Sequence, residues 1–255
     1  MIDNPTLQVL NNRVSLRVYE HREISQETLD VILEAMMRAP TAGNQMLYSV
    51  IVVRDQKTKE ILAQTCDHQA FIATAPVILI FLADHQRWFD YYRLNGVAEY
   101  CDREGLQFEA PQESDLLLAI EDAMIAAQNA VIAAESLGIG SCYIGDVMEN
   151  CERQRELLHL PDYVFPAAML VFGWPTRQQR ERPKPARCPM EQIVHTNAYR
   201  CMDGQELRAM LAGRTGAQGF EDWCAAFCAR KYDSDFSREM TRSVEEYLHQ
   251  FMRGK

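Results

Sequence analysis

A long, mostly apolar segment at residues 115–137 constrains the fold of this chain more than any other feature. Its polar residues recur seven positions apart, at 121, 128 and 135 and again at 122, 129 and 136, so a helix here carries one narrow polar stripe. Gly138 follows at once and is typical of a helix end. We therefore expect a helix buried nearly all round, either within one domain or partly against a second subunit. Its charged and amide side chains make it too polar for a membrane span.

Four short runs rich in β-branched and aromatic residues predict the strands of a sheet. They are Tyr48–Val53, Val77–Ala83, Ser141–Ile144 and Ala167–Phe172. Their apolar residues are continuous rather than alternating, which is typical of strands covered on both faces. Helical patterns at Gln26–Arg38 and Gln56–Thr65 lie between the strands. The sequence predicts an α+β fold, a mixed α/β sandwich in which helices flank a central sheet.

The last third of the chain differs from the rest in composition and periodicity. Residues 176–187 are polar, rich in Pro and Arg and without periodicity, which predicts a loop. Helical spacing returns at Gly204–Ala212, Phe220–Lys231 and Phe236–Arg253. Because no strand accompanies these helices, we expect residues 1–200 to form the main domain and residues 201–255 a helical extension.

Composition excludes several classes of function. The chain has 26 Lys and Arg against 36 Asp and Glu, a net charge of −10, which disfavours nucleic-acid binding and makes any local basic cluster informative. The eight cysteines show no C-x-x-C pair and no zinc spacing, so we expect reduced thiols and no metal site. The usual P-loop, Rossmann, α/β-hydrolase and zincin motifs are missing. The first residues do not resemble a secretory signal, which predicts a cytoplasmic protein without a membrane partner.

Two short basic motifs stand out against this acidic background. In residues 13–17 (RVSLR), an extended backbone would place Arg13, Ser15 and Arg17 on one face, a set that suits a phosphate dianion. The alternative is an exposed helix start with solvated arginines. A second cluster, with Lys184 and Arg187, lies in the loop after the last strand and could equally be a solvated charge run.

Two turns expose backbone groups. Residues 39–45 (APTAGNQ) lie between a helix and a strand, and their Pro, Gly and Asn predict a turn with free backbone donors and acceptors. Residues 138–146 (GIGSCYIGD) form a strand that stops at Gly145, where a glycine lets the backbone approach a flat ligand closely.

In their order and spacing these segments resemble the FMN-dependent, oxygen-insensitive nitroreductase and flavin reductase family, in particular its larger branch with a C-terminal helical extension. The matching segments are residues 13–17, Ala39–Asn44, Ala123–Gly140 running into Tyr143-Ile144-Gly145, Phe172–Pro175 and Lys184–Pro189. The likeness covers residues from about 10 to about 200. It implies a nitroreductase-like fold and an intertwined homodimer with one FMN in each of two interface sites, on which residues 201–255 pack.

The resemblance also implies residue roles. Arg13, Ser15, Arg187 and Lys184 resemble phosphate ligands, and Arg17 resembles the cation beside flavin N1 and the C2 carbonyl, where it would stabilise the reduced flavin. The full set of implied FMN-binding residues is Arg13, Ser15, Arg17, Thr41, Asn44, Gln69, Tyr143, Ile144, Gly145, Asp146, Lys184 and Arg187.

Three of these flavin contacts are more specific. Gln69 resembles the amide at the flavin pyrimidine edge, although it could also be a solvated loop residue. The turn from Thr41 to Asn44 is expected under the ring and the ribityl chain. The Gly145 N–H is expected to face N5 and O4.

The chain departs from the family pattern at three places. Val14 replaces a frequent His or basic residue, and Asp146 replaces a second glycine, which adds negative charge near the flavin. The family's Lys-Pro-Arg is here Lys-Pro-Ala-Arg, one residue longer, which displaces Lys184 more than Arg187.

The implied activity is that of an NAD(P)H:acceptor oxidoreductase. Hydride passes from NADH or NADPH to flavin N5 in a ping-pong cycle, and nitroaromatics, quinones or flavins accept two electrons without any catalytic side chain. The alternative is an FMN-binding storage or sensor protein with little NAD(P)H turnover, and Asp146 is the feature that supports it.

Overall fold

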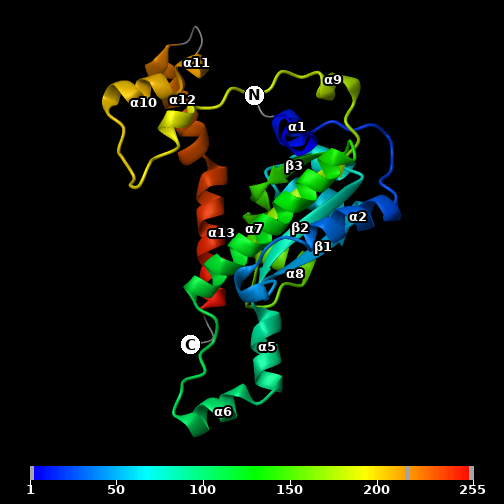
Figure 1. Cartoon of the computed structure of the whole chain (residues 1–255), viewed down its shortest axis with the longest axis vertical. Coiled ribbons are helices and arrows are strands. Elements are labelled where there is room, and N and C mark those ends of the chain that lie inside the picture. The colour runs from blue at the N-terminus through cyan, green and yellow to red at the C-terminus, as the bar shows by residue number, and fades with distance from the viewer. Residues whose placement is uncertain (1–2, 216–218, 253–255) are drawn as a thin grey trace. The chain divides into compact units, whose positions relative to one another are not determined.

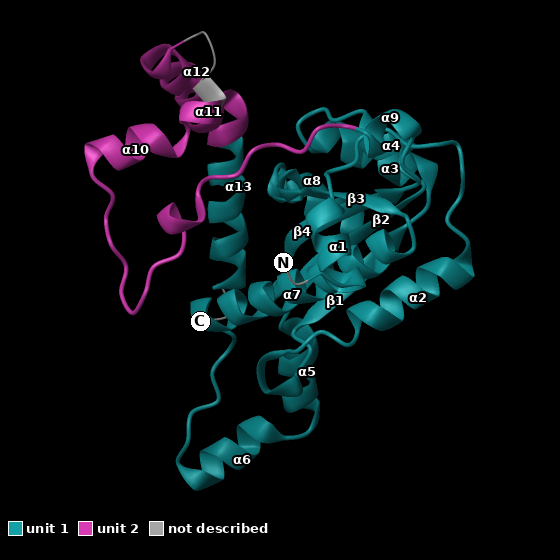
Figure 2. Ribbon diagram, turned by 45° about the horizontal axis from the view of Figure 1, so that its top comes forward, with its two compact units in different colours: residues 1–181, 239–255 teal, residues 182–238 magenta. Residues whose placement is uncertain are grey.

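The computed structural model describes residues 3–215 and 219–252. It divides into two compact units (Figure 2): one contains the chain up to Glu181 together with the C-terminal segment from Glu239, and the other contains Arg182–Arg238. The predicted boundary at residue 200 stays a prediction.

The first unit is built on a four-stranded antiparallel sheet with strand order β1-β2-β4-β3. The strands are β1 Tyr48–Val53, β2 Val77–Asp84, β3 Gly140–Ile144 and β4 Val164–Gly173. All four were predicted, and β1 matches residue for residue. Every residue of β2 is buried, as its unbroken apolar run indicated.

Helices cover both faces of this sheet (Figure 1). On one face, α2 (Gln26–Met36) and α7 (Glu113–Ser136) pack on alternate residues of β2, among them Leu79 and Phe81. The core of the other face contains Ile78 and Ile80 of β2, and it includes residues of α3 (Gln56–Thr65), α8 (Cys151–Leu158) and the C-terminal part of α13 (Asp235–Phe251). The mixed α/β sandwich is confirmed.

The long helix α7 is the core helix that the sequence predicted, but a single chain buries only one side of it. Nine of its 24 residues are buried, whereas Leu117, Leu118 and Ile125 are 61%, 44% and 42% exposed. By length and composition α7 could cross a membrane, yet it contacts all four strands as well as α2. The apolar pattern did not distinguish burial in the chain from burial against another surface.

The first unit contains further helices that the sequence analysis did not assign. They are α1 (Pro5–Asn12), α4 (Phe71–Thr74), α5 (Gln86–Leu94), α6 (Val97–Glu104), α8 and α9 (Arg177–Arg180), with 3-10 turns η1 (Ala42–Asn44) and η2 (Gly145–Met148). Helix α9 lies in the segment 176–187 that was predicted to be a loop. Helices α5 and α6 extend away from the sheet (Figure 1).

The second unit contains η3 (Met190–Gln192), α10 (Gly204–Met210), α11 (Ala212–Thr215) and α12 (Phe220–Tyr232), followed by the start of α13. In its described residues it has helices and no strand, as predicted.

Candidate functional site

The basic motif near the N-terminus lies beside β3. Helix α1 ends at Asn12, and the chain then runs extended, with Ser15 bridged in parallel to Ser141 and the Leu16 N–H donating to the Ser141 carbonyl at 2.8 Å. Leu16 is only 1% exposed and lies against Gly140, where an added Cβ would be 2.8 Å from the Leu16 Cδ2. The motif is therefore fixed on the sheet and is not an exposed helix start.

Arg13 is half-buried and lies near the side chains of Glu135 and Tyr143. Its Nη1 is buried and has no hydrogen-bond partner among the described residues. Burial raises the pKa of Glu135 to about 7 and that of Tyr143 to about 12, and the Arg13 charge opposes both shifts. The Tyr143 hydroxyl donates to Gln128 Oε1 at 3.3 Å. A buried guanidinium nitrogen without an acceptor is suited to an anion such as phosphate.

A second group forms beyond the end of β3. Gln69 Nε2 donates to Asp146 Oδ2 at 2.9 Å and to the Cys66 carbonyl at 3.1 Å. Phe71 follows Gln69 by two residues, and the guanidinium carbon of Arg17 lies 5.8 Å from the centre of the Phe71 ring. Gly145, adjacent to Asp146, has an exposed backbone. The structure thus gathers four of the predicted residues.

The turn that carries Thr41 and Asn44 is held by a buried carboxylate. Asp122 of α7, 3% exposed, accepts from the Ala42 N–H at 2.9 Å and from the Leu47 N–H at 3.1 Å. The turn contains a left-handed backbone at Asn44, with φ of 57°. In the sequence, Asp122 stood out only as part of a polar stripe; a carboxylate among alanines was the signal that it has a specific partner.

One chain does not bring this turn to the Arg17 and Gln69 group. The turn leads into β1, at one edge of the sheet, whereas Gly145 follows β3, at the other edge. Three strand spacings separate the two edges, roughly 14–15 Å. The residues predicted for one flavin site therefore lie on two sides of the first unit.

The two remaining predicted ligands, Lys184 and Arg187, belong to the second unit, where both are exposed. Their approach to Arg13 stays a prediction.

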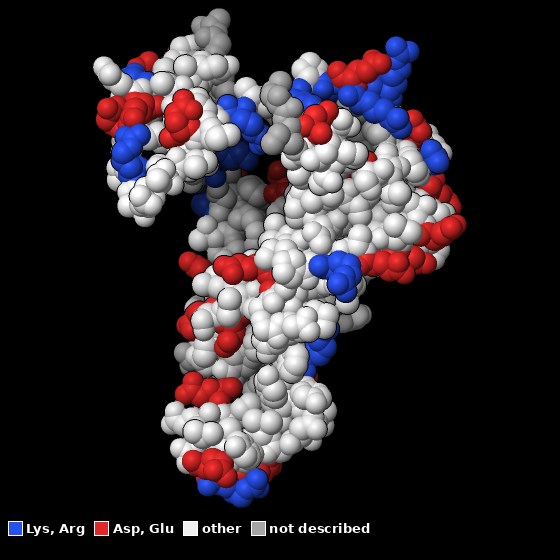
Figure 3. All heavy atoms as spheres, viewed as in Figure 1, with Lys and Arg blue, Asp and Glu red and all other residues white. Residues whose placement is uncertain are grey.

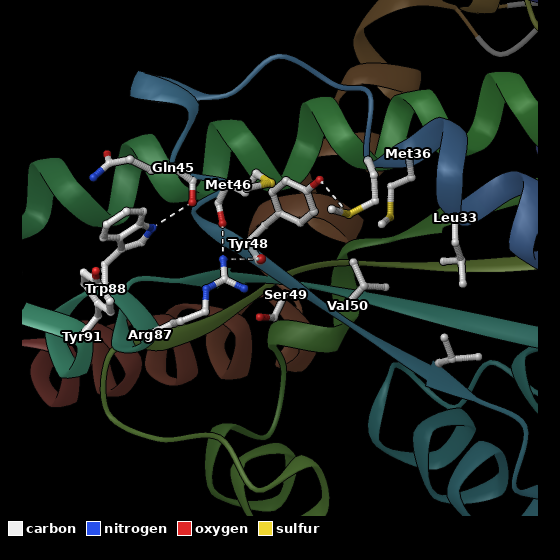
Figure 4. Close-up of a pocket in the computed structure, with 12 residues that line it drawn as sticks. Leu33, Met36, Gln45, Met46, Tyr48, Ser49, Val50, Arg87, Trp88 and Tyr91 are labelled. Carbon is white, nitrogen blue, oxygen red and sulfur yellow. Dashed lines mark hydrogen bonds between the residues drawn. The ribbon is translucent and has the colours of Figure 1, made fainter. Parts of the chain in front are cut away.

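An apolar groove of about 670 Å³ lies beside the turn, along edge strand β1 (Figure 4). Its walls include Leu33 and Met36 of α2, and Trp88 of α5, whose Nε1 donates to the Gln45 carbonyl at 2.8 Å. Arg87 donates to the carbonyls of Met46 and Tyr48. The groove is open and mainly apolar. Of its other polar side chains, Ser49 donates to Asp84 and the Tyr48 hydroxyl to Met37 Sδ.

Comparison with known proteins identifies the family. The Nitroreductase family model matches residues 10–174. This chain belongs to the nitroreductase family. It is 32% identical to an FMN reductase [NAD(P)H] of Bacillus subtilis, over 96% of this chain and 91% of that protein, and 32% identical to a Cr(VI) reductase of Pseudomonas sp., over 94% and 96%. Nitroreductase A from Vibrio parahaemolyticus has the same fold, with a TM-score of 0.80, 25% identity and 98% of each chain covered.

The described residues of this nitroreductase fit an FMN. The unpartnered Nη1 of Arg13 suits the phosphate, and Arg17, the Gln69 amide and the exposed Gly145 backbone suit the polar edge of a flavin ring. By contrast, residues 3–215 and 219–252 contain no group of three or more His, Cys, Asp or Glu that could hold a metal ion.

Proposed function

We propose that this nitroreductase is an FMN-dependent NAD(P)H:acceptor oxidoreductase. The observation that carries the proposal is the edge of β3: a buried guanidinium nitrogen of Arg13 that has no hydrogen-bond partner among the described residues, and Arg17, Gln69 and Gly145 beyond the strand's end. These groups match a phosphate and a flavin ring. The named relatives are reductases, so they do not support the alternative of a storage or sensor protein.

When bound, FMN would supply the redox chemistry, the transfer of two electrons from NADH or NADPH to a second substrate. The residues of this chain bind and tune it. Arg13 and Ser15 would hold the phosphate, and Lys184 and Arg187 are its further proposed ligands; Arg17 would stabilise negative charge at flavin N1 and the C2 carbonyl. The Gly145 N–H would donate to N5 or O4 of the flavin, and Tyr143, Ile144 and Asp146 would line the same part of the site. No side chain acts as a general acid or base.

We propose further that the active species is an intertwined homodimer. The Thr41–Asn44 turn lies at the opposite sheet edge from Arg17, so a second copy of the chain is needed to supply it to the same flavin. The exposed apolar residues of α7 and the groove along β1 offer the surface for that copy. The middle of this face carries few charged side chains (Figure 3), as expected for an interface core.

The finer assignments follow from the same reasoning. We propose small nitroaromatics, quinones or free flavins as electron acceptors, packing of residues 201–255 on the dimer, and a cytoplasmic location. The net charge of −10 disfavours nucleic acid as a partner.

Absorbance and stopped-flow spectroscopy test the proposed function. The purified protein is expected to carry FMN that bleaches when mixed anaerobically with NADH or NADPH. Flavin that does not bleach with either nucleotide would refute the oxidoreductase and favour storage.

The phosphate assignment has its own test. The double variant Arg13→Ala/Arg187→Ala is expected to lose FMN during purification, whereas Arg177→Ala, which removes an exposed arginine paired with Glu181, keeps it. A double variant that retains a full complement of flavin contradicts the assigned phosphate ligands.

The dimer is tested by light scattering coupled to size exclusion. Ile125→Arg buries a charge in the proposed interface and is expected to give monomers with weakened FMN binding. The matched control, Gln64→Arg at an exposed position of α3, adds the same charge elsewhere and should remain dimeric. Ile125→Arg protein that stays dimeric refutes this interface.

A further inference from the structure

We propose that Asp146 is a positioning residue for the flavin: it orients the Gln69 amide so that the carbonyl oxygen faces the N3–H of FMN, and its carboxylate makes the bound flavin harder to reduce. The inference rests on the proposed function, and it concerns a contact between two residues 77 positions apart in the chain.

The orientation of Gln69 follows from its neighbours. The side-chain nitrogen faces two acceptors, the Cys66 carbonyl at 3.1 Å and Asp146 Oδ2 at 2.9 Å. An amide group has two N–H donors on nitrogen and only acceptors on oxygen, so the opposite orientation would set an oxygen against two oxygens. Asp146 therefore helps to fix which end of the amide is the nitrogen.

With both donors engaged, Gln69 can offer a ligand only an acceptor. Its Oε1 has no hydrogen-bond partner in the described ranges of the chain, and it is not among the fully buried side-chain atoms. The pyrimidine edge of a flavin presents one donor, N3–H, between two carbonyl acceptors. The N3–H is thus the flavin group complementary to this oxygen.

The surroundings of Asp146 are acidic. Glu149 follows Asp146 by three residues, and its Oε2 accepts from the Asp67 N–H at 2.8 Å. The pKa of Glu149 is raised first by burial and further by the charges of Asp67 and Asp146, so these carboxylates influence one another. Two-electron reduction leaves negative charge on the flavin, and a carboxylate nearby opposes it while Arg17 favours it.

The test is the midpoint potential of FMN in the holoenzyme, together with the dissociation constant of FMN from the apoprotein. Asp146→Asn is expected to raise the affinity for reduced over oxidised FMN roughly tenfold, about 30 mV for two electrons. It should also weaken the binding of oxidised FMN roughly threefold, because the Gln69 amide loses its fixed orientation. In a Gln69→Ala background the second effect should vanish.

The matched control is Glu149→Gln, which removes a carboxylate of the same acidic group without touching Gln69. It should change the ratio of the affinities for reduced and oxidised FMN less than about twofold. Asp146→Ser serves if Asp146→Asn does not fold, with the same expected direction. Equal potentials in wild type and either variant, or an equal shift in Glu149→Gln, overturn the inference alone. Wild-type protein that binds no FMN overturns the proposed function and the inference with it.

Discussion

The buried carboxylate of Asp122 offers the sharpest test of how the turn at residues 41–47 is held. Asp122→Asn preserves the shape of the side chain but replaces one oxygen with an NH2 group that faces a backbone N–H. Hydrogen bonds to a charged acceptor contribute about 1.5–3 kcal/mol each, and a buried donor without an acceptor costs about 1–3 kcal/mol. Since the carboxylate accepts from both Ala42 and Leu47, we expect a loss of roughly 3 kcal/mol.

For a chain of this size that loss lowers the melting temperature by roughly 6–12 °C. Circular dichroism during thermal and urea unfolding measures it, with Glu60→Gln as the control: an exposed residue of α3, outside the proposed interface, whose substitution should change stability by less than about 0.5 kcal/mol. Because the turn carries Thr41 and Asn44, Asp122→Asn should also weaken FMN binding. Equal stability of the two variants would refute the reasoning.

Two further predictions concern the pH response and the N-terminal segment. The pKa of Glu135 rises from 4.5 to about 7 on folding, so between these pH values the native state holds a proton that the unfolded state has released. The free energy of unfolding therefore falls as pH rises through this window. The urea midpoint should depend less on pH in Glu135→Gln than in wild type, and an equal dependence would contradict the assignment. In Gly173→Ala the new Cβ would overlap with the Tyr19 ring, which should lower the free energy of unfolding by about 1–3 kcal/mol and weaken FMN binding. The control in thermal melting is Gly204→Ala, whose new Cβ has nothing within 4 Å. Equal losses of stability in the two variants would contradict the overlap.

The sheet was predictable because continuous apolar runs mark strands buried on two faces. Strand β4 begins at Val164, three residues before the predicted start, because Pro166 interrupts the pattern. The proline is tolerated there since β3 ends at Ile144, opposite Met169, and leaves this part of β4 with a neighbour on one side only.

Helices α5 and α6 escaped prediction for a physical reason. Helix α5 has no buried residue, its His85 cap makes no side-chain hydrogen bond, and its aromatic residues are weak helix formers. Its apolar residues do recur at helical spacing, but only over nine residues, so its shortness and its lack of a capping side chain hid it. Helix α6 begins directly after Gly96, whose backbone is left-handed, and a glycine at this place in the sequence is typical of a turn.

The candidate site was predictable along β3, where Arg13, Ser15 and Arg17 share one extended segment. The contact between Gln69 and Asp146 was not, because it joins a loop and a 3-10 turn through tertiary structure. The opposite-edge position of Asn44 was likewise invisible, since strand order cannot be read from spacing along the chain.

The separation of Asn44 and Arg17 on opposite sheet edges has a genetic consequence in the proposed dimer. An allele damaged only at the turn and another damaged only at the arginine edge would each yield two defective sites when alone. Coexpressed, the two polypeptides would assemble mixed dimers in which one site receives both intact halves. Interallelic complementation, with mixed dimers retaining about half the wild-type number of working sites, would thus reveal the shared architecture inside living cells.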